Sequence, residues 1–315
     1  MRNETVGKSH SKIILMGEHS VVYGQPAIAL PISSVSLTAQ VQPQRMDRTI
    51  QSKYFIGSIA KAPSNLLGVK RLIQAILIKF RQAKATFSMQ IESTIPSERG
   101  MGSSAAVAIA ITRALYRYFN QPLDHQKLLK VSNIEEKITH GNPSGIDTAA
   151  ASSNQPVWFV PGHQIQSAPL NLTGWLIIAD SGIKGRTDIA VNSVRQEIIN
   201  HPEFAKPLIQ KLGKLTKDTK IGLANNQIIK VGQDMDSAQR CLAKLGVSSM
   251  ALDKLVNIAK DSGAYGAKLT GSGLGGCIIA LAKSKVQAIG ISNALLNIGA
   301  VNTWLQPLGN QGVQK

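Results

Sequence analysis

The sequence predicts an α+β protein of two domains, and three observations support this fold class. The chain has 315 residues, which is enough for about two domains with cores of their own. Segments that alternate apolar and polar residues are interspersed with segments that repeat apolar residues at helical spacing. A looser stretch rich in Pro, Gly and Asn, residues 154–174, separates the two halves. We therefore expect an N-terminal domain over residues 1–172 and a C-terminal domain over residues 173–315.

The first half is predicted to open with strands and to continue with helices. Alternating side chains predict half-buried strands, and apolar residues three or four apart predict amphipathic helices. Ser103 or Ser104 can cap the second helix, and Asp124 can cap the third. The expected strands are residues 12–15, 35–41 and 87–91, and the expected helices are residues 66–80, 104–119 and 126–139.

The second half is predicted to contain more helices than strands. An apolar strand over residues 175–179 follows the domain boundary. No internal repeat of about 20 to 50 residues is found in the sequence, so a solenoid is not expected. The expected helices are residues 187–200, 202–217, 226–245 and 249–262, followed by a strand, a helix and a strand that ends at residue 308.

The chain is strongly basic. Its 35 Lys and Arg residues against 18 Asp and Glu residues give a net charge of +17, which favours anionic partners such as phosphorylated metabolites, anionic lipids or nucleic acids. The cations are scattered, aromatic residues make up only 4% of the chain, and no nucleic-acid-binding motif is found. Nucleic acid is therefore not an expected partner, and a generally cationic surface is the alternative interpretation.

The composition is that of a globular protein, with 43% hydrophobic and 17% charged residues. The longest uncharged apolar run, residues 105–111, is much shorter than the roughly 20 residues of a membrane span, and residues 13–16 are too few for a signal-peptide core. Cys241 and Cys277 form neither a disulfide framework nor a CxxC motif. We expect a soluble cytoplasmic protein without a membrane partner.

A glycine-rich turn precedes the second helix. Residues 96–106 run from a strand through Gly100 and Gly102 into an apolar helix. The glycines let backbone N–H groups approach an anion, and the helix start carries the positive end of the helix dipole. Ser103 and Ser104 can offer hydroxyls to a phosphate or to a bridging Mg²⁺. The segment is not a GxxxxGK[ST] P-loop, since no Lys follows Gly102, and an ordinary capped helix is the alternative interpretation.

Residues 271–276 contain the pattern GxGxxG, which in another context indicates a dinucleotide site. Here the glycines lead into a β-branched strand instead of a helix, and no Asp or Glu follows Asp261. A Rossmann site is therefore not expected. A glycine loop that packs close to a ligand or to another backbone, and a tight hairpin, both stay open.

Three further segments combine polar groups that could carry chemistry. Glu136 and Asp147 can converge across a turn as a metal ligand and a proton acceptor, although this segment taken by itself is better explained by a solvated Glu and a helix-capping Asp. Lys12 begins an apolar strand, and Glu18 and His19 follow just beyond the end of that strand. No His pair has the spacing of a zinc site. Residues 180–187 have the cations and hydroxyls of an anion-binding turn, or of a loop with a Thr cap.

Four segments in this order resemble the GHMP kinases. They are residues 12–24 (KIILMGEHSVVYG), 100–106 (GMGSSAA), 141–147 (GNPSGID) and 271–276 (GSGLGG), and the resemblance spans residues 12–276. Residues 20–24 and 140–145 resemble most the members that phosphorylate mevalonate. Two departures are small, because Met101 stands where Leu is usual and Arg99 lies at a variable position.

The resemblance implies both a fold and an activity. The fold is an N-terminal α/β domain with a left-handed β-α-β crossover, an exception to the right-handed rule, followed by a ferredoxin-like C-terminal domain. The activity is transfer of the γ-phosphoryl group of ATP to the primary (C5) hydroxyl of mevalonate, which gives 5-phosphomevalonate for isoprenoid biosynthesis. ATP is the co-substrate and Mg²⁺ the cofactor.

The resemblance also implies roles for individual residues. Asp147 matches the base that accepts the hydroxyl proton, Lys12 lies beside it, and Ser104 and Glu136 match the Mg²⁺ ligands. Residues 271–276 are expected to line the cleft between the domains. The residues expected to hold ATP are Pro96, Arg99, Gly100, Met101, Gly102, Ser103, Ser104 and Ala105. The residues expected near mevalonate are Glu18, His19, Ser144, Thr187, Gly271 and Ser272.

Two alternatives stay open. A sibling kinase would act on phosphomevalonate or galactose, but galactokinases carry an Asp-containing segment after Gly-Glu-His, and residues 20–24 contain no Asp. A non-catalytic sensor would have lost a catalytic group, whereas every group matched above is present in the sequence. The sequence does not decide whether the chain forms a homodimer.

Overall fold

The computed structural model describes residues 4–140 and 144–309. The chain divides into two compact units, and neither is continuous in sequence. Unit 1 consists of Met1–Lys12, Val35–Pro96 and Gly102–Asn154, and unit 2 consists of Ile13–Ser34, Ser97–Met101 and Gln155–Lys315. Two segments from the first half of the chain therefore belong to unit 2, and the division of the family domains at residue 172 stays a prediction.

Unit 1 is built on a mixed β-sheet. Strand β2 pairs antiparallel with β5, β5 pairs parallel with β3, β3 pairs antiparallel with β4, and β1 also pairs with β2. In β2 the buried residues Val35, Leu37, Ala39 and Val41 alternate with more exposed neighbours, which is the pattern that predicted this strand. The strand bounds are β1 Thr5–Met16, β2 Ala27–Pro43, β3 Arg48–Gln51, β4 Ile56–Ser58 and β5 Phe87–Ser93.

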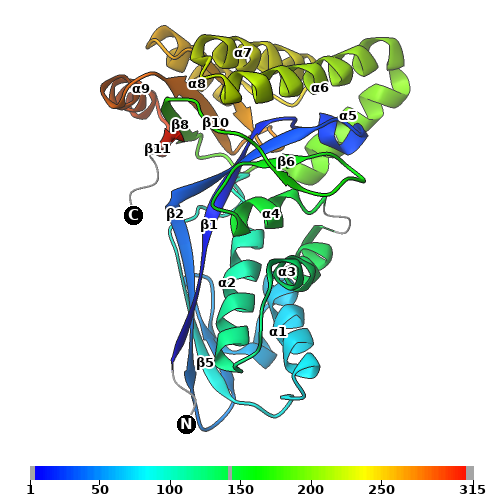
Figure 1. Cartoon of the computed structure of the whole chain (residues 1–315), viewed down its shortest axis with the longest axis vertical. Coiled ribbons are helices and arrows are strands. Elements are labelled where there is room, and N and C mark those ends of the chain that lie inside the picture. The colour runs from blue at the N-terminus through cyan, green and yellow to red at the C-terminus, as the bar shows by residue number, and fades with distance from the viewer. Residues whose placement is uncertain (1–3, 141–143, 310–315) are drawn as a thin grey trace. The chain divides into compact units, whose positions relative to one another are not determined.

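Three long helices of unit 1 pack against one another and cover one face of this sheet (Figure 1). Helix α2 approaches β1 closely, because a Cβ at Gly7 would lie 2.0 Å from the backbone oxygen of Ala110. The Ser9 hydroxyl donates a hydrogen bond of 2.7 Å to the Ala106 carbonyl and fixes the register of this contact. The helices are α1 Leu67–Lys79, α2 Ser103–Tyr118, α3 His125–His140 and the short α4 Ile146–Ser152.

Unit 2 contains a four-stranded antiparallel sheet in the order β11-β8-β10-β9. Along the chain its elements follow as strand, helices, two strands, helix and strand, so the fourth strand lies beside the first and the third lies between the first and the second. This is the ferredoxin-like topology that was expected for the C-terminal part. The strands are β8 Gly174–Asp180, β9 Gly266–Thr270, β10 Cys277–Ala282 and β11 Asn302–Leu308. Two further strands, β6 Val157–Phe159 and β7 Gln166–Ser167, pair with each other, and β6 pairs with the start of β2.

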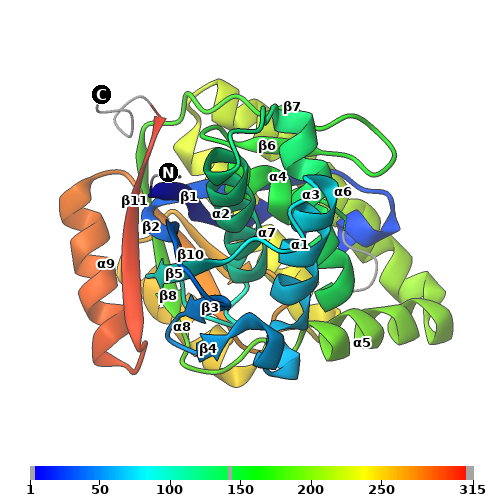
Figure 2. The same cartoon turned by 90° about the horizontal axis from the view of Figure 1, so that it is seen from below.

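The helices of unit 2 support this sheet, and Figure 2 shows α9 running alongside β11. Strand β9 lies at the sheet edge, where backbone N–H groups lack a strand partner. Side chains of α7 supply that partner, since Asp236 accepts from the Ala267 N–H and Gln239 accepts from the Leu269 N–H, each at 2.9 Å. Both edges of β9 are therefore held. The helices are α5 Thr187–Asn200, α6 Pro202–Ala224, α7 Ile228–Lys244, α8 Met250–Asp261 and α9 Lys285–Asn297.

The sequence predictions of strands and helices differ from the structure in several places. Strand β2 begins at Ala27 instead of Val35, and the short strands β3, β4, β6 and β7 were not predicted. Strand β1 begins at Thr5 instead of Lys12, because its first half is too polar to show an apolar strand pattern. Helix α6 extends seven residues beyond the expected end at Lys217 to Ala224. Helix α4 has only seven residues, too few to display helical periodicity. No helix in the described part of the chain combines the length and the apolar character needed to cross a bilayer.

Candidate active site

The glycine-rich turn and the start of α2 form the first part of the site. Gly100 and Gly102 have φ angles of 76° and 70°, in the left-handed region that favours glycine. Helix α2 begins at Ser103, one residue before the expected Ser104, and Gly102 lies at its N-cap, so the predicted cap by a serine side chain is wrong. The N–H groups of a first helical turn have no carbonyl partner within the helix, so this end of α2 is suited to an anion.

Lys12 and Asp147 form an ion pair beside the start of α2. Lys12 Nζ lies 2.8 Å from Asp147 Oδ1, and the Lys12 side chain is 4% exposed whereas that of Asp147 is 36% exposed. A Cβ at Gly102 would lie 2.7 Å from Lys12 Cγ, so only glycine leaves room for the Lys12 side chain to pass the helix start. Asp147 lies in the first turn of α4 and remains accessible to a small molecule. The pair therefore presents a carboxylate that is oriented by a buried cation.

Two adjacent carboxylates of α3 lie beside this pair. Glu135 accepts hydrogen bonds from the hydroxyls of Ser104 and Thr139. Glu136 is 3% exposed, and its buried Oε1 accepts no hydrogen bond. Burial, together with the negative charges of Asp147 and Glu135, raises the pKa of Glu136 from 4.5 to about 8. The cluster is short of positive charge, and in the absence of a bound cation Glu136 is protonated at neutral pH.

This cluster offers the oxygen ligands that Mg²⁺ prefers. Within residues 4–140 and 144–309, no three His, Cys, Asp or Glu side chains are arranged to hold a metal ion by themselves. A nucleotide-bound Mg²⁺ needs only one or two protein oxygens, because phosphates and water supply the rest. The Ser104 hydroxyl and the unpartnered Oε1 of Glu136 fit that requirement. Glu135 was not singled out in the sequence, although its position next to Glu136 was the available signal.

In unit 2, the segment Gly17-Glu18-His19 carries the second set of predicted residues. Glu18 pairs with Lys268 of β9, and both side chains are fully buried. His19 Nε2 lies 2.9 Å from the Ser272 carbonyl. Because a carbonyl can only accept, Nε2 carries the hydrogen. Burial and the nearby Lys268 charge lower the pKa of His19, so the ring is neutral at pH 7 and Nδ1 is a hydrogen-bond acceptor.

The glycine loop of residues 271–276 joins β9 to β10 in a hairpin. It leads into a strand, so the structure agrees with the rejection of a Rossmann site. A Cβ at Gly271 would lie 3.3 Å from the Cα of Gly100, so within unit 2 this loop packs directly against the backbone of the glycine-rich turn. The Thr187 hydroxyl donates to the Ser272 hydroxyl at 3.1 Å, which brings the predicted residues Thr187 and Ser272 together.

Two predicted residues have structural partners of their own. The Arg99 guanidinium pairs with Asp180 at 2.9 Å and donates to the Gly182 carbonyl at 3.0 Å, so the side chain fixes the loop that precedes Gly100. Ser144 is exposed, and its hydroxyl accepts a hydrogen bond from the Ile146 N–H at the start of α4. Residues 141–143 of the GNPSGID motif lie outside the described residues.

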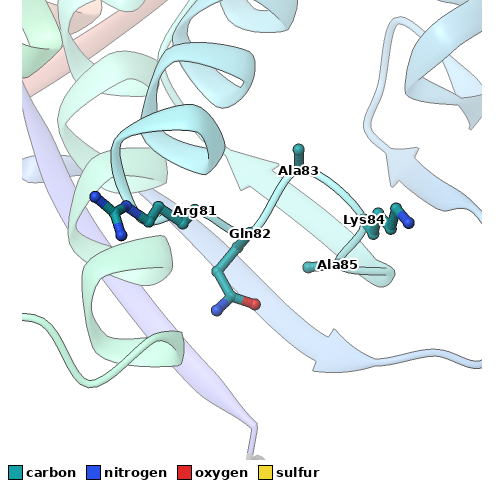
Figure 3. A pocket seen from close by; sticks show the side chains of 5 residues that line it. All are labelled: Arg81, Gln82, Ala83, Lys84 and Ala85. Atoms are coloured by element: carbon teal, nitrogen blue, oxygen red, sulfur yellow. The ribbon is translucent and has the colours of Figure 1, made fainter.

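A pocket elsewhere in unit 1 contains none of these residues. It lies at the turn between α1 and β5, and Figure 3 shows that one short stretch of chain lines it. Its lining residues are Arg81, Gln82, Ala83, Lys84 and Ala85. We assign this pocket no part in the reaction.

Comparison with known proteins identifies two family domains in the chain. Residues 68–155 match the N-terminal domain of the GHMP kinases, and residues 220–300 match their C-terminal domain. The chain is 31% identical over 303 residues to a mevalonate kinase of Pyrococcus abyssi, covering 89% of each chain. Among solved structures it is similar to a mevalonate kinase of methicillin-resistant Staphylococcus aureus, with 29% identity, a TM-score of 0.77 and coverage of 98% and 100% of the two chains. The L. major mevalonate kinase in complex with R-mevalonate has the same fold, with a TM-score of 0.81, 24% identity and coverage of 98% and 97%.

Proposed function

The chain belongs to the GHMP kinase family, and on this basis we propose that it is an ATP-dependent mevalonate kinase. It transfers the γ-phosphoryl group of ATP to the C5 hydroxyl of mevalonate and produces 5-phosphomevalonate in the mevalonate pathway. The choice of mevalonate as acceptor is supported by the similarity to curated mevalonate kinases along about nine-tenths of both chains. The buried, free cysteines Cys241 and Cys277 are compatible with the reducing cytoplasm that we propose as its location.

The Lys12–Asp147 pair is the observation that best supports phosphoryl transfer to a hydroxyl group as the reaction. Asp147 is the base that accepts the proton of the attacking hydroxyl, since its carboxylate is accessible while its cationic partner is buried. Lys12 orients this carboxylate and stabilises the negative charge that develops on the hydroxyl oxygen. Phosphoryl transfer depends mainly on positioning and charge neutralisation, so no covalent intermediate with the protein is required.

ATP binds to the glycine-rich turn and the start of α2. The backbone N–H groups of residues 100–105 hold the phosphates, with Pro96 and Arg99 shaping the turn before them. Ser104 and Glu136 are the residues that would hold Mg²⁺, which would offset the negative charge of the phosphates. Glu136 must lose its proton to act as a ligand, and the neighbouring negative charges that raise its pKa also attract the cation.

Mevalonate binds to residues with polar side chains that the structure holds in fixed orientations. His19 offers Nδ1 as an acceptor for a hydroxyl group, because its other ring nitrogen is committed to Ser272. Thr187 and Ser272 contribute hydroxyls that already form a hydrogen bond with each other. The proposed acceptor-binding residues are Glu18, His19, Ser144, Thr187, Gly271 and Ser272.

An assay of ADP release with four acceptors tests this function. The purified protein is supplied with ATP and Mg²⁺ and with mevalonate, phosphomevalonate, galactose or homoserine in separate reactions. We expect turnover with mevalonate to exceed turnover with each of the others by far. Equal or faster turnover with phosphomevalonate would show that the protein is a sibling kinase, and no turnover with any acceptor would support the non-catalytic sensor.

A further inference from the structure

Three alternate residues of β9 and the following loop hold the segment of residues 14–19. Lys268 pairs with Glu18, and the Ser272 carbonyl accepts from the His19 ring. Between them, the Thr270 hydroxyl accepts from the Ile14 N–H at 3.1 Å and donates to the Ile14 carbonyl at 2.8 Å. Alternate residues of a strand lie on one face, so a single face of β9 provides the contacts of Lys268 and Thr270, and the backbone of Ser272 in the following loop adds the third. We call Lys268, Thr270 and Ser272 the β9 clasp.

The segment that the clasp holds has a strained backbone. Gly17 has a φ angle of 101°, and His19 combines a φ of 57° with a ψ of −46°. A residue with a side chain rarely adopts a positive φ, and such a conformation persists only where surrounding contacts enforce it. The Glu18 and His19 side chains therefore depend on outside contacts for their orientation, and the clasp supplies those contacts.

The buried Lys268–Glu18 ion pair contributes little net free energy to the stability of the fold. Both side chains have 0% exposure, and Lys268 Nζ also donates to the Leu269 carbonyl. Removing two charges from water costs free energy that their mutual attraction repays only in part, so apolar residues of the same size would stabilise the fold equally well. Unlike an apolar pair, the ion pair fixes the orientation of the Glu18 carboxylate, because the hydrogen bond from Lys268 is directional.

The other side of the clasp is rigid. Strand β9 pairs with β10 along its length, and the Asp236 and Gln239 side chains of α7 bind its outer edge. A Cβ at Gly266 would lie 2.1 Å from the Gly232 carbonyl oxygen, so α7 and the start of β9 are in direct backbone contact. The clasp thus connects a strained segment to a fixed strand.

We propose that Lys268 is a positioning residue for the acceptor site, acting through Glu18 and assisted by Thr270. The proposal rests on the proposed function, in which His19 binds mevalonate and Glu18 lies beside it at the acceptor site. Lys268 is fully buried, and its ammonium group contacts Glu18 and the Leu269 carbonyl. Its loss should weaken mevalonate binding and leave ATP binding unchanged, because the residues that hold ATP are not among its contacts.

The test compares Lys268→Met, Thr270→Val and two matched controls. Thr270→Ser keeps the hydroxyl, and Lys230→Met removes the lysine from another pair of unit 2 whose carboxylate, Asp234, is buried. We expect Lys268→Met to raise the KM for mevalonate by about tenfold or more and Thr270→Val by roughly threefold, with the KM for ATP within about twofold of wild type. Both controls should stay within about twofold of wild type for both substrates.

A double variant tests whether Lys268 acts through Glu18. If it does, adding Lys268→Met to Glu18→Gln should raise the KM for mevalonate no further than Glu18→Gln alone. Independent, multiplicative effects would overturn the proposal, as would equal rises in the KM of both substrates. If Lys268→Met does not fold, the Thr270→Val variant tests the proposal instead, because Val has nearly the same volume as Thr. A KM for mevalonate that is equal in Thr270→Val and Thr270→Ser would refute the role of the clasp.

The two proposals fail in different ways. A wild-type protein that does not phosphorylate mevalonate contradicts the proposed function. A wild-type protein that does so, together with a Lys268→Met variant of unchanged KM for mevalonate, contradicts only the positioning role. Equilibrium binding of mevalonate measured by calorimetry, without ATP, gives a second reading that does not depend on turnover.

Discussion

Replacing Glu136 by Gln should change how the stability of the metal-free protein depends on pH. Burial, followed by the charges of Asp147 and Glu135, raises the pKa of Glu136 to about 8 in the folded protein. Between about pH 4.5 and 8 the folded protein therefore binds a proton that the unfolded chain has released. The resulting stabilisation is complete below pH 4.5 and is lost as the pH rises through 8. Gln has nearly the same shape and is neutral at every pH, so the variant lacks this dependence.

The size of the effect follows from the width of that window. One pKa unit corresponds to about 1.4 kcal/mol. Between about pH 6 and 8 the free energy of unfolding of the wild-type protein should therefore fall by ~2 kcal/mol relative to that of Glu136→Gln. Glu92→Gln is a matched control, because Glu92 is an exposed glutamate of the same unit and its loss should leave the pH dependence unchanged.

Urea unfolding at several pH values, with a chelator present, measures this difference. Circular dichroism follows the helices of both units, whereas tryptophan fluorescence, excited selectively over tyrosine, reports on unit 2 alone, because Trp158, Trp175 and Trp304 all belong to unit 2. The pH effect should therefore be seen in circular dichroism even where the fluorescence transition does not move. Parallel pH profiles for wild type and Glu136→Gln would refute the assignment of a buried, protonated Glu136.

Three further predictions concern the reaction and the cysteines. Asp147→Asn should lower kcat by about 10²- to 10⁴-fold at saturating ATP, mevalonate and Mg²⁺, and extra Mg²⁺ should not restore kcat. A near-normal kcat in steady-state assays would exclude Asp147 as the base. Gly102→Ala should lower kcat more than Gly145→Ala, because both positions have positive φ but only the methyl group at 102 meets the Lys12 side chain, at 2.7 Å; equal kcat values would contradict this explanation. Both cysteines are buried and burial raises the pKa of their thiols, so a thiol reagent should label them only after unfolding; rapid labelling of the native protein would disprove this.

The parts of the site that depend on neighbouring residues could be predicted from the sequence. The turn at Gly100 and Gly102 and a helix that begins close to Ser104 follow from a glycine pattern next to a helical repeat, and the structure confirms the turn and places the helix start one residue earlier, at Ser103. The glycines of residues 271–276 could be distinguished from those of a dinucleotide site because apolar strand residues follow them, and these residues form β10. In each case the deciding signal lies within a few residues of the feature.

Contacts between distant segments could not be predicted in this way. Lys268 stands in a short apolar strand, and nothing near it in sequence indicates that its partner, Glu18, is 250 residues away. Glu135 and Glu136 are neighbours, yet only packing shows that one accepts from Ser104 while the other keeps a buried, unpartnered oxygen. The assignment of residues 13–34 to unit 2 is equally a result of tertiary contacts.

Identification of the reaction product tests the proposed function most directly. The purified protein is incubated with ATP, Mg²⁺ and R-mevalonate, and the product is identified by mass spectrometry and ³¹P NMR. We predict one 5-phosphomevalonate for each ADP released, and at least ~100-fold slower formation by Asp147→Asn under the same conditions. Phosphorylation of another acceptor with none of mevalonate, or phosphorylation of mevalonate at an unchanged rate by Asp147→Asn, would contradict the proposed function and its mechanism.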